Sequence, residues 1–203
     1  MTMRLVVDNS KDAAREIARI VDMRLSFDAL SGLTALLHPQ KYRHRTFVQT
    51  PGETTTTIAF VAKGLIRQYQ QTDEQDMMYD VCHEDDILFS MESLISQTPS
   101  PLYIQTLEPT IIYAIDYQEL KLLASRLPEI NELLTRILER CIMRMAARQH
   151  YLDLPPIERY LALMNADSEI IRRTPLKYIA WYLRMAPETL SRVRNKLNNR
   201  ENQ

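Results

Sequence analysis

The chain has 203 residues, and its 25 Lys/Arg and 26 Asp/Glu give a formal net charge of −1. Hydrophobic residues make up 45% of the sequence, so we expect a globular protein with one large domain or two small ones. No run of about 18 apolar residues is present and the N-terminus MTMRLVVDNS is not a signal peptide, so we expect a cytoplasmic protein with no membrane partner. The two cysteines, Cys82 and Cys141, form no disulfide framework and cannot hold a four-cysteine iron–sulfur cluster within one chain.

The first predicted elements are two helices within residues 10–37, with a break near residues 26–32. From residue 38 the sequence pattern changes, because Pro and Gly now separate short runs rich in β-branched and aromatic residues. We predict strands at 46–48, 54–61, 65–71, 77–82 and 103–107. Short strands at roughly ten-residue spacing are typical of an antiparallel barrel or sandwich.

A short helix at 117–127 precedes a long helix at 128–152. The first apolar stripe of the long helix consists of Ile130, Leu134, Ile137, Cys141 and Met145. A second stripe beside it consists of Leu133, Leu138, Ile142 and Ala146. One stripe can cover the barrel while the other pairs with a second copy of the chain in a coiled-coil-like seam, and we assign the first stripe to the dimer. The alternative is a core helix buried on two sides of a monomer.

The chain ends with two predicted helices that a sharp turn separates. Thr174 can cap the first helix and Pro175 can occupy its first position, whereas Pro187 starts the second. Only residues 184–186 lie between the helices, which defines a helix-turn-helix. Its inward positions are apolar, namely Ile179, Ala180, Leu183, Met185, Leu190, Val193 and Leu197. Before it, residues 153–156 break the long helix as a hinge would.

The outward face of the last helix is polar, which by itself also fits a solvated helical hairpin. Charge favours DNA binding, because residues 171–203 hold eight Lys/Arg against two Glu, a formal +6, and leave −7 for residues 1–170. A basic tail on an acidic body is the electrostatic footprint of a small DNA-binding module.

The segment IAWYLRMAPETLSRVRNKL at 179–197 resembles the helix-turn-helix of the CRP/FNR family of bacterial transcription regulators, whose second helix carries the pattern (R/P)-E-T-(V/L)-(S/G)-R. The resemblance implies base contacts by Glu188 and Arg192, with supporting contacts by Thr189 and Ser191. The implied phosphate contacts are Arg173, Thr174, Lys177 and Lys196. The sequence departs from the family at Arg184, where Gly is usual, and at Ala186, where a Ser or Thr cap is common. Six residues follow Leu197, so we expect a short or missing β-wing.

Upstream, the motifs PGE at 51–53 and VAKGLIRQY at 61–69 resemble cyclic-nucleotide-binding barrels, with Gly64 in a hairpin turn. The resemblance then implies an α+β protein with a sensor domain (1–127), a dimerisation helix (128–153) and a helix-turn-helix domain (154–203). Such a homodimer binds a near-palindromic site on double-stranded DNA, and RNA polymerase if it is an activator. The alternative function is an effector- or partner-binding interaction module whose basic tail docks an acidic protein. No catalytic motif indicates an enzyme.

The sequence argues against cyclic AMP as the effector. The family's Gly-Glu pair is missing from 86–92, and Ser100-Pro101 stands in place of an Arg-Ser/Thr pair. Residues 68–120 contain no Lys or Arg and eleven Asp/Glu, which would repel an anionic ligand. We therefore expect no cofactor and no metal, and the identity of the effector is unknown.

Cys82-His83 resembles the ligands of haem-containing relatives, but adjacent strand residues point to opposite faces, which favours a buried structural Cys beside a surface His. A redox role for Cys82 stays open, although nearby acidic residues would raise the pKa of its thiol.

Overall fold

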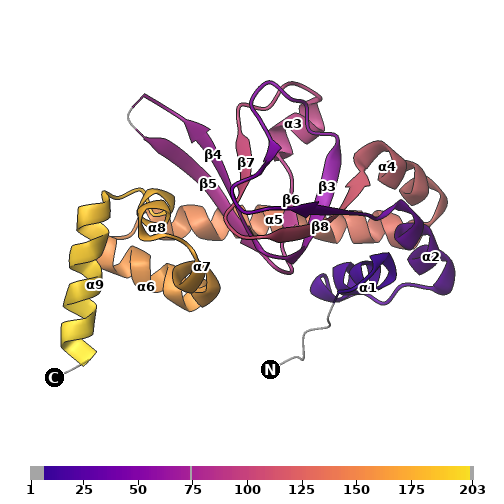
Figure 1. The fold of residues 1–203 in the computed structure, drawn as a ribbon. Helices are drawn as coiled ribbons and strands as arrows, with labels where there is room; N and C mark the ends of the chain where they lie inside the picture. The colour runs from indigo at the N-terminus through magenta and orange to yellow at the C-terminus, as the bar shows by residue number, and fades with distance from the viewer. Residues whose placement is uncertain (1–6, 74, 202–203) are drawn as a thin grey trace.

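The computed structural model describes residues 7–73 and 75–201 (Figure 1). Helices α1 (Ser10–Ile20) and α2 (Phe27–Leu36) come first. Their caps define them, because the Asn9 side chain accepts from the Asp12 N–H and the Ser26 side chain accepts from the Ala29 N–H. The break therefore lies at 21–26, earlier than predicted, and Gly32 lies inside α2.

Two four-stranded antiparallel sheets form the middle of the molecule. The strands are β1 (His38–Tyr42), β2 (Phe47–Gln49), β3 (Thr57–Lys63), β4 (Leu65–Gln71), β5 (Asp76–His83), β6 (Ile87–Leu88), β7 (Tyr103–Thr106) and β8 (Thr110–Asp116), with α3 (Met91–Ser96) between β6 and β7. The strand orders are β1-β8-β3-β6 and β2-β7-β4-β5. This arrangement confirms the jelly-roll-like α+β prediction. Strands β1, β6 and β8 were not predicted.

The β3–β4 hairpin turns at Gly64, as predicted, and the structure shows why Gly is required there. Its φ is +110°, a conformation that L side chains rarely adopt. A Cβ would also lie 2.4 Å from Oγ1 and 2.8 Å from Cα of Thr110, at the start of β8. The hairpin therefore approaches the neighbouring backbone too closely for any side chain.

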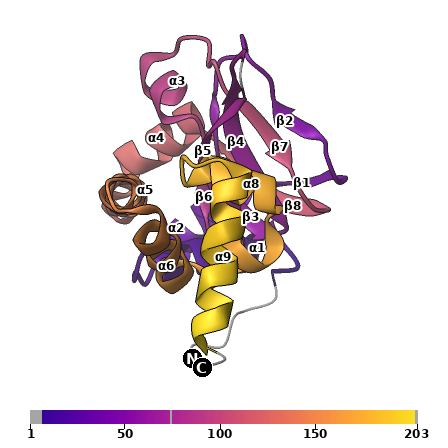
Figure 2. The same ribbon diagram turned by 90° about the vertical axis from the view of Figure 1, so that its left-hand side faces the viewer.

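The rest of the chain is helical: α4 (Tyr117–Arg126), α5 (Pro128–Leu152), α6 (Pro156–Ala166), α7 (Ser168–Arg173), α8 (Leu176–Tyr182) and α9 (Pro187–Glu201). The predicted break after the long helix is confirmed. Figure 1 shows α5 running behind the sheets from α4 to the C-terminal helices, and Figure 2 looks down its axis with α9 in front. Helix α9 continues to Glu201, and no strand follows it in the part of the chain that the structure describes.

Three apolar clusters hold these parts together. One joins α1, α2, α4 and the first half of α5 to the sheet that contains β3 and β8. A second fills the space between the sheets. The third joins the C-terminal helices to strands β4 and β5 through Leu65, Tyr69, Met78 and Val81. The C-terminal helices are therefore packed directly against the sandwich.

Candidate functional site

The helix-turn-helix is formed by α8, α9 and the residues between them. Arg184 adopts a left-handed φ of 51°, so a side-chain-bearing residue occupies the position where Gly would be less strained. Two backbone bonds close this turn, from the Arg184 N–H to the Trp181 carbonyl and from the Met185 N–H to the Ala180 carbonyl. The Arg159 guanidinium on α6 donates to the carbonyl oxygens of Leu183 and Arg184, which further fixes the turn.

Packing between the two helices follows the predicted inward positions. Ala180 is fully buried where α8 meets α9, together with Ile179, Leu183, Leu190 and Val193. A small residue at this crossing lets the helices approach closely. The outward face of α9 is consequently free of any packing role.

That outward face carries the predicted base-contacting residues. Glu188, Ser191 and Arg192 are exposed and Thr189 is half-buried. The Arg192 Nε donates to the Glu188 carbonyl oxygen at 3.4 Å, so the two side chains start from adjacent turns of one face. Within the described part of the chain, no carboxylate forms an ion pair with Arg192, Arg194 or Lys196. These cations are therefore available to an external anion.

The four predicted phosphate contacts do not share one environment. Lys196 and Lys177 are exposed, and the Lys177 ammonium lies 4.3 Å from the centre of the Trp181 ring. Arg173, in contrast, is held by Glu84 and Glu108 of the sandwich, with N–O distances of 2.5 and 2.6 Å. Arg173 therefore faces the sandwich in this structure.

Thr174 does not cap α8, which corrects the prediction. Its side chain is buried, and its hydroxyl oxygen has no hydrogen-bond partner among the described residues. The reason is α7, which was not predicted. Thr174 is the C-cap of this helix, which ends at Arg173, and α8 begins after Pro175 without a side-chain cap. A buried hydroxyl cannot reach a DNA phosphate in this conformation.

The predicted dimer stripe on α5 also needs a correction. Ile130, Leu134 and Ile137 are buried in their own chain, and Cys141 packs on the same cluster. Met145 alone among the five is exposed, at 57%. The physical reason is that this stripe packs on the sandwich of its own chain, which is one of the two uses expected for the apolar stripes of α5. The exposed apolar residues in the second half of α5 are Ile142, Met143, Met145, Ala146 and Ala147. Of these, Ile142 and Ala146 belong to the second predicted stripe.

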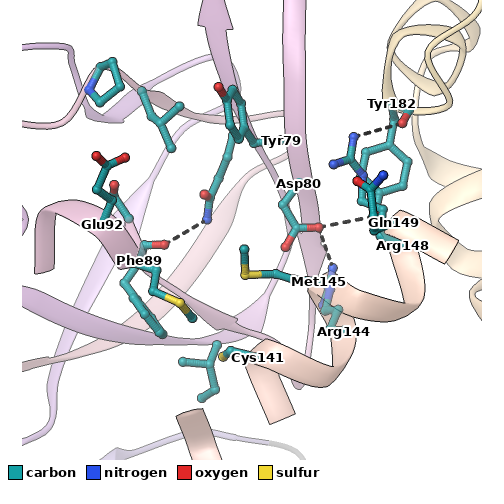
Figure 3. Close-up of a pocket in the computed structure, with 16 residues that line it drawn as sticks. Tyr79, Asp80, Phe89, Glu92, Cys141, Arg144, Met145, Arg148, Gln149 and Tyr182 are labelled. Atoms are coloured by element: carbon teal, nitrogen blue, oxygen red, sulfur yellow. Dashed lines mark hydrogen bonds and ion pairs between the residues drawn. The ribbon is translucent and has the colours of Figure 1, made fainter. Parts of the chain in front are cut away.

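A cavity of about 300 Å³ lies between the sandwich and α5, and Figure 3 shows its lining. Apolar side chains include Ile87, Phe89, Leu102 and Met145. Two cations reach it from α5, Arg144 and Arg148, and Tyr182 closes it from α8. Sequence reasoning missed both arginines, because it considered only residues 68–120. The local sequence holds no signal for them.

Protein groups already engage both cavity arginines. Arg144 forms ion pairs with Asp80 and Asp86, and burial, which would lower its pKa, is outweighed by these carboxylates. Arg148 donates to the carbonyl oxygens of Met78 on β5 and Tyr182 on α8, at 2.8 and 3.0 Å. Two carboxylates thus neutralise Arg144, whereas the buried Nε of Arg148 has no hydrogen-bond partner among the described residues.

Cys82 and His83 lie in different environments, as their alternation on β5 predicts. Cys82 is completely buried between the sheets, and burial, followed by the nearby Asp80 carboxylate, raises the pKa of its thiol well above its usual value. His83 is half-buried, and its Nε2 lies 2.8 Å from the Asp167 carboxylate.

Within residues 7–73 and 75–201, no three His, Cys, Asp or Glu side chains are arranged to hold a metal ion. Among the same residues, no helix has the length and apolar character that a membrane span requires.

Comparisons with known proteins agree with this architecture. Residues 39–126 match the cyclic nucleotide-binding domain family. The c-di-GMP-responsive global regulator CLP of Xanthomonas campestris is 18% identical, with a TM-score of 0.67 over 87% of this chain and 93% of that one. FixK2 of Bradyrhizobium japonicum is 16% identical, with a TM-score of 0.67 over 81% and 86%. The catabolite activator protein of Thermus thermophilus is 15% identical, with a TM-score of 0.52 over 90% and 88%. No curated protein sequence matches the chain.

The matched segment and the solved structures agree on the fold. The chain as a whole has the fold of these regulators, and its C-terminal helices α8 and α9 fit a helix-turn-helix. By fold, then, the chain resembles the CRP/FNR-type regulators.

Proposed function

We propose that the chain is a cytoplasmic bacterial transcription regulator that binds DNA in a sequence-specific way as a homodimer. The observation that carries the proposal is the outward face of α9, where Glu188 and Arg192 stand beside each other and the cations lack a carboxylate partner within the described residues. Arg can donate to guanine and Glu can accept from the cytosine amino group in the major groove. Lys177 and Lys196 would hold phosphates on either side.

The dimer supplies the second half of the proposed site. Exposed Ile142, Met143, Met145 and Ala146 on α5 form the face that would pair with the same face of a second subunit. Two copies of α9 would then read half-sites about one DNA turn apart, roughly 34–36 Å. An activator would in addition contact RNA polymerase.

We further propose that this regulator does not depend on cyclic AMP. Ser100, which aligns with the phosphate-binding pair of cyclic AMP-dependent relatives, is buried and hydrogen-bonded to Ser90. The two arginines that reach the cavity are engaged by protein acceptors. A nucleotide phosphate would have to displace the Asp80 and Asp86 carboxylates before it could bind Arg144.

Selection of duplex DNA from a random pool by the purified, ligand-free protein tests the function. We expect enrichment of a two-fold symmetric site whose affinity falls steeply with salt, by a slope of about 0.9 for each phosphate contact. The alternative is an interaction module with a basic tail. If an acidic polypeptide binds the protein, and duplex DNA neither enriches nor competes with it, the alternative is correct and the regulator proposal is wrong.

A further inference from the structure

Helix α7 is attached to the sandwich at both of its ends. Asp167 precedes its first turn and Arg173 is its last residue. Both side chains reach turns at one end of the sandwich, the β5–β6 turn with His83 and Glu84 and the β7–β8 turn with Glu108. We call these five residues the α7 clasp.

Arg173 uses its guanidinium as a bridge between two separate turns. Its Nη1 lies 2.5 Å from Glu84 Oε2, while its Nε and Nη2 donate to Glu108 at 3.2 and 2.6 Å. The side chains of Arg173 and Glu84 are each only 13% exposed. Such charge-assisted, bidentate contacts are stronger and more directional than exposed surface ion pairs, which contribute little to stability.

Glu84 is itself fixed from the opposite side. The Gly64 N–H donates to its Oε1 at 2.9 Å, so the β3–β4 hairpin orients the carboxylate toward Arg173. Burial alone would raise the pKa of Glu84, but the hydrogen bonds from Arg173 and from the Gly64 N–H outweigh burial and lower that pKa to about 2. The carboxylate is therefore ionised whenever the clasp is closed.

Asp167 performs two tasks with its two oxygens. Its Oδ1 accepts from the Ile170 N–H and caps α7, while its Oδ2 faces His83 Nε2 at 2.8 Å. The residue that starts the helix is thus also the residue that attaches it to β5. Since α8 follows α7 after two residues, the position of α7 determines where the helix-turn-helix begins.

Two more contacts hold α8 itself on the same sheet. The Arg67 guanidinium on β4 lies between the rings of Tyr69 and Tyr178, 3.8 and 4.1 Å from their centres. Arg148 joins β5 to the Tyr182 carbonyl of α8. These contacts involve other side chains than the clasp, so the docked position of the helix-turn-helix is supported independently at α7 and at α8.

We propose that Arg173 is a positioning residue, which with Asp167 clasps α7 to the sensor turns and sets the orientation of the helix-turn-helix, and is not a phosphate contact. The inference rests on the proposed function, since it assigns the sensor domain control over where α9 meets DNA. It predicts that neutralising either side of the clasp has the same effect, because both changes open one set of contacts.

Hydrogen exchange of the full-length protein tests the clasp without DNA. We expect Arg173→Gln to speed amide exchange in residues 168–174, and the double variant Glu84→Gln/Glu108→Gln to speed it equally, with no further gain in the triple variant. Exchange in α1 and α2 should stay unchanged, which separates opening of the clasp from a folding defect. Unchanged exchange at 168–174 in both variants would overturn the proposal.

DNA binding as a function of salt separates the two roles of Arg173. Removal of one phosphate-binding cation from each subunit lowers the slope of log affinity against log salt by about 0.9 per subunit, or about 2 per dimer. We expect Arg173→Gln to leave the slope within experimental error of that of the unmodified protein, while the matched control Lys196→Gln lowers it. An equal decrease of slope in both variants contradicts the positioning role.

The glutamate variants also distinguish the positioning role of Arg173 from the phosphate-contact role, because the two roles predict different salt slopes. If Arg173 were a phosphate contact that Glu84 and Glu108 keep occupied, then Glu84→Gln/Glu108→Gln would free it and steepen the salt slope. The clasp predicts no steepening. Should the protein bind no DNA at all, the proposed function fails, whereas the exchange measurement still decides the clasp.

Discussion

Arg192 and Lys196 lie one turn apart on α9, yet we expect them to make different kinds of contact. Arg192 lies one helical turn after Glu188, and its guanidinium can donate two parallel hydrogen bonds to guanine. The Lys196 ammonium is instead a point charge on a flexible side chain. Base contacts specify sequence, while phosphate contacts supply affinity that is common to all sequences. Single substitutions can therefore separate the two roles.

We predict that Arg192→Ala relaxes specificity at one base step, with a loss of about 1–3 kcal/mol of discrimination against the wrong base. Lys196→Ala should weaken cognate and random duplexes alike and reduce the salt dependence. Titration of both variants against the selected site and its single-base variants measures this. Equal losses on cognate and random DNA for Arg192→Ala would show that Arg192 reads no base.

Residues predicted from local patterns were placed well, and those that depend on distant partners were not. Gly64 was identified because a hairpin needs a positive φ, which is a local requirement. Arg173 was assigned to DNA because it lies in a basic segment, yet its carboxylate partners are 65 and 89 residues away in the sequence. Charge counted along the chain does not reveal pairs that form only in the fold.

Helix α5 divides its surface between two uses. Its first half is buried against the sandwich on the side that carries Ile130, Leu133 and Ile137. Its second half exposes Ile142, Met143 and Met145, by 54%, 68% and 57%. Such an exposed apolar run on one helix indicates a protein interface.

We predict that Ile142→Glu converts the dimer to a monomer, because it puts a charge into the apolar centre of the proposed interface. Gln118→Glu is the matched control, since it places the same carboxylate at an exposed position of α4, outside the proposed interface. Light scattering at several protein concentrations gives the oligomeric state. A dimer that withstands Ile142→Glu would place the interface on a different face.

At the level of elements, length explains several of the successes and omissions, although the seven-residue β8 was also missed. The 25-residue α5 and the seven-residue β4 were recognised from their periodicity. The two-residue β6 and the six-residue α7 are too short for a periodic signal. The omission of α7 mattered most, because it led to Thr174 being assigned as the cap of α8.

One titratable pair, His83 and Asp167, contributes to the docking of α7 on the sandwich. His83 Nδ1 faces the Glu84 carbonyl oxygen at 3.0 Å and Nε2 faces Asp167 at 2.8 Å, so both ring nitrogens meet acceptors. The doubly protonated ring is the form that satisfies both. Burial lowers the pKa of His83, but the Asp167 hydrogen bond and the Asp86 and Asp167 charges raise it above 6.5, against an opposing effect of Arg144. Glu169 on α7 also faces this group.

The sign of the pH effect follows from these shifts. Because the pKa of docked His83 is raised, its contribution is complete below its ordinary pKa and is lost as pH rises through the raised value. Burial raises the pKa of Asp167, but the His83 hydrogen bond outweighs this and lowers it, so Asp167 stays ionised well into acid. The pair is therefore complete between these two pKa values.

We predict that amide exchange in α7 accelerates, beyond the intrinsic effect of pH, as pH rises from about 6 to 9. His83→Asn should remove this excess, since asparagine does not titrate in that range. Asp167→Asn is a second variant that keeps an N-cap for α7 while removing the charge. If the excess persists in His83→Asn, another group controls the docking.

Asp80 gives the cavity a direct connection to the DNA-binding helices. Its carboxylate pairs with Arg144 of α5 and lies 3.4 Å from the Tyr182 hydroxyl of α8, and all three residues line the cavity (Figure 3). Suppose that a ligand in the cavity binds more tightly when α8 is in one position than when it is in another. The ligand must then shift the equilibrium between the two conformations by that difference in affinity. Thermodynamic linkage then requires the reverse: duplex DNA that prefers one position changes the affinity of the cavity for its occupant by the same factor.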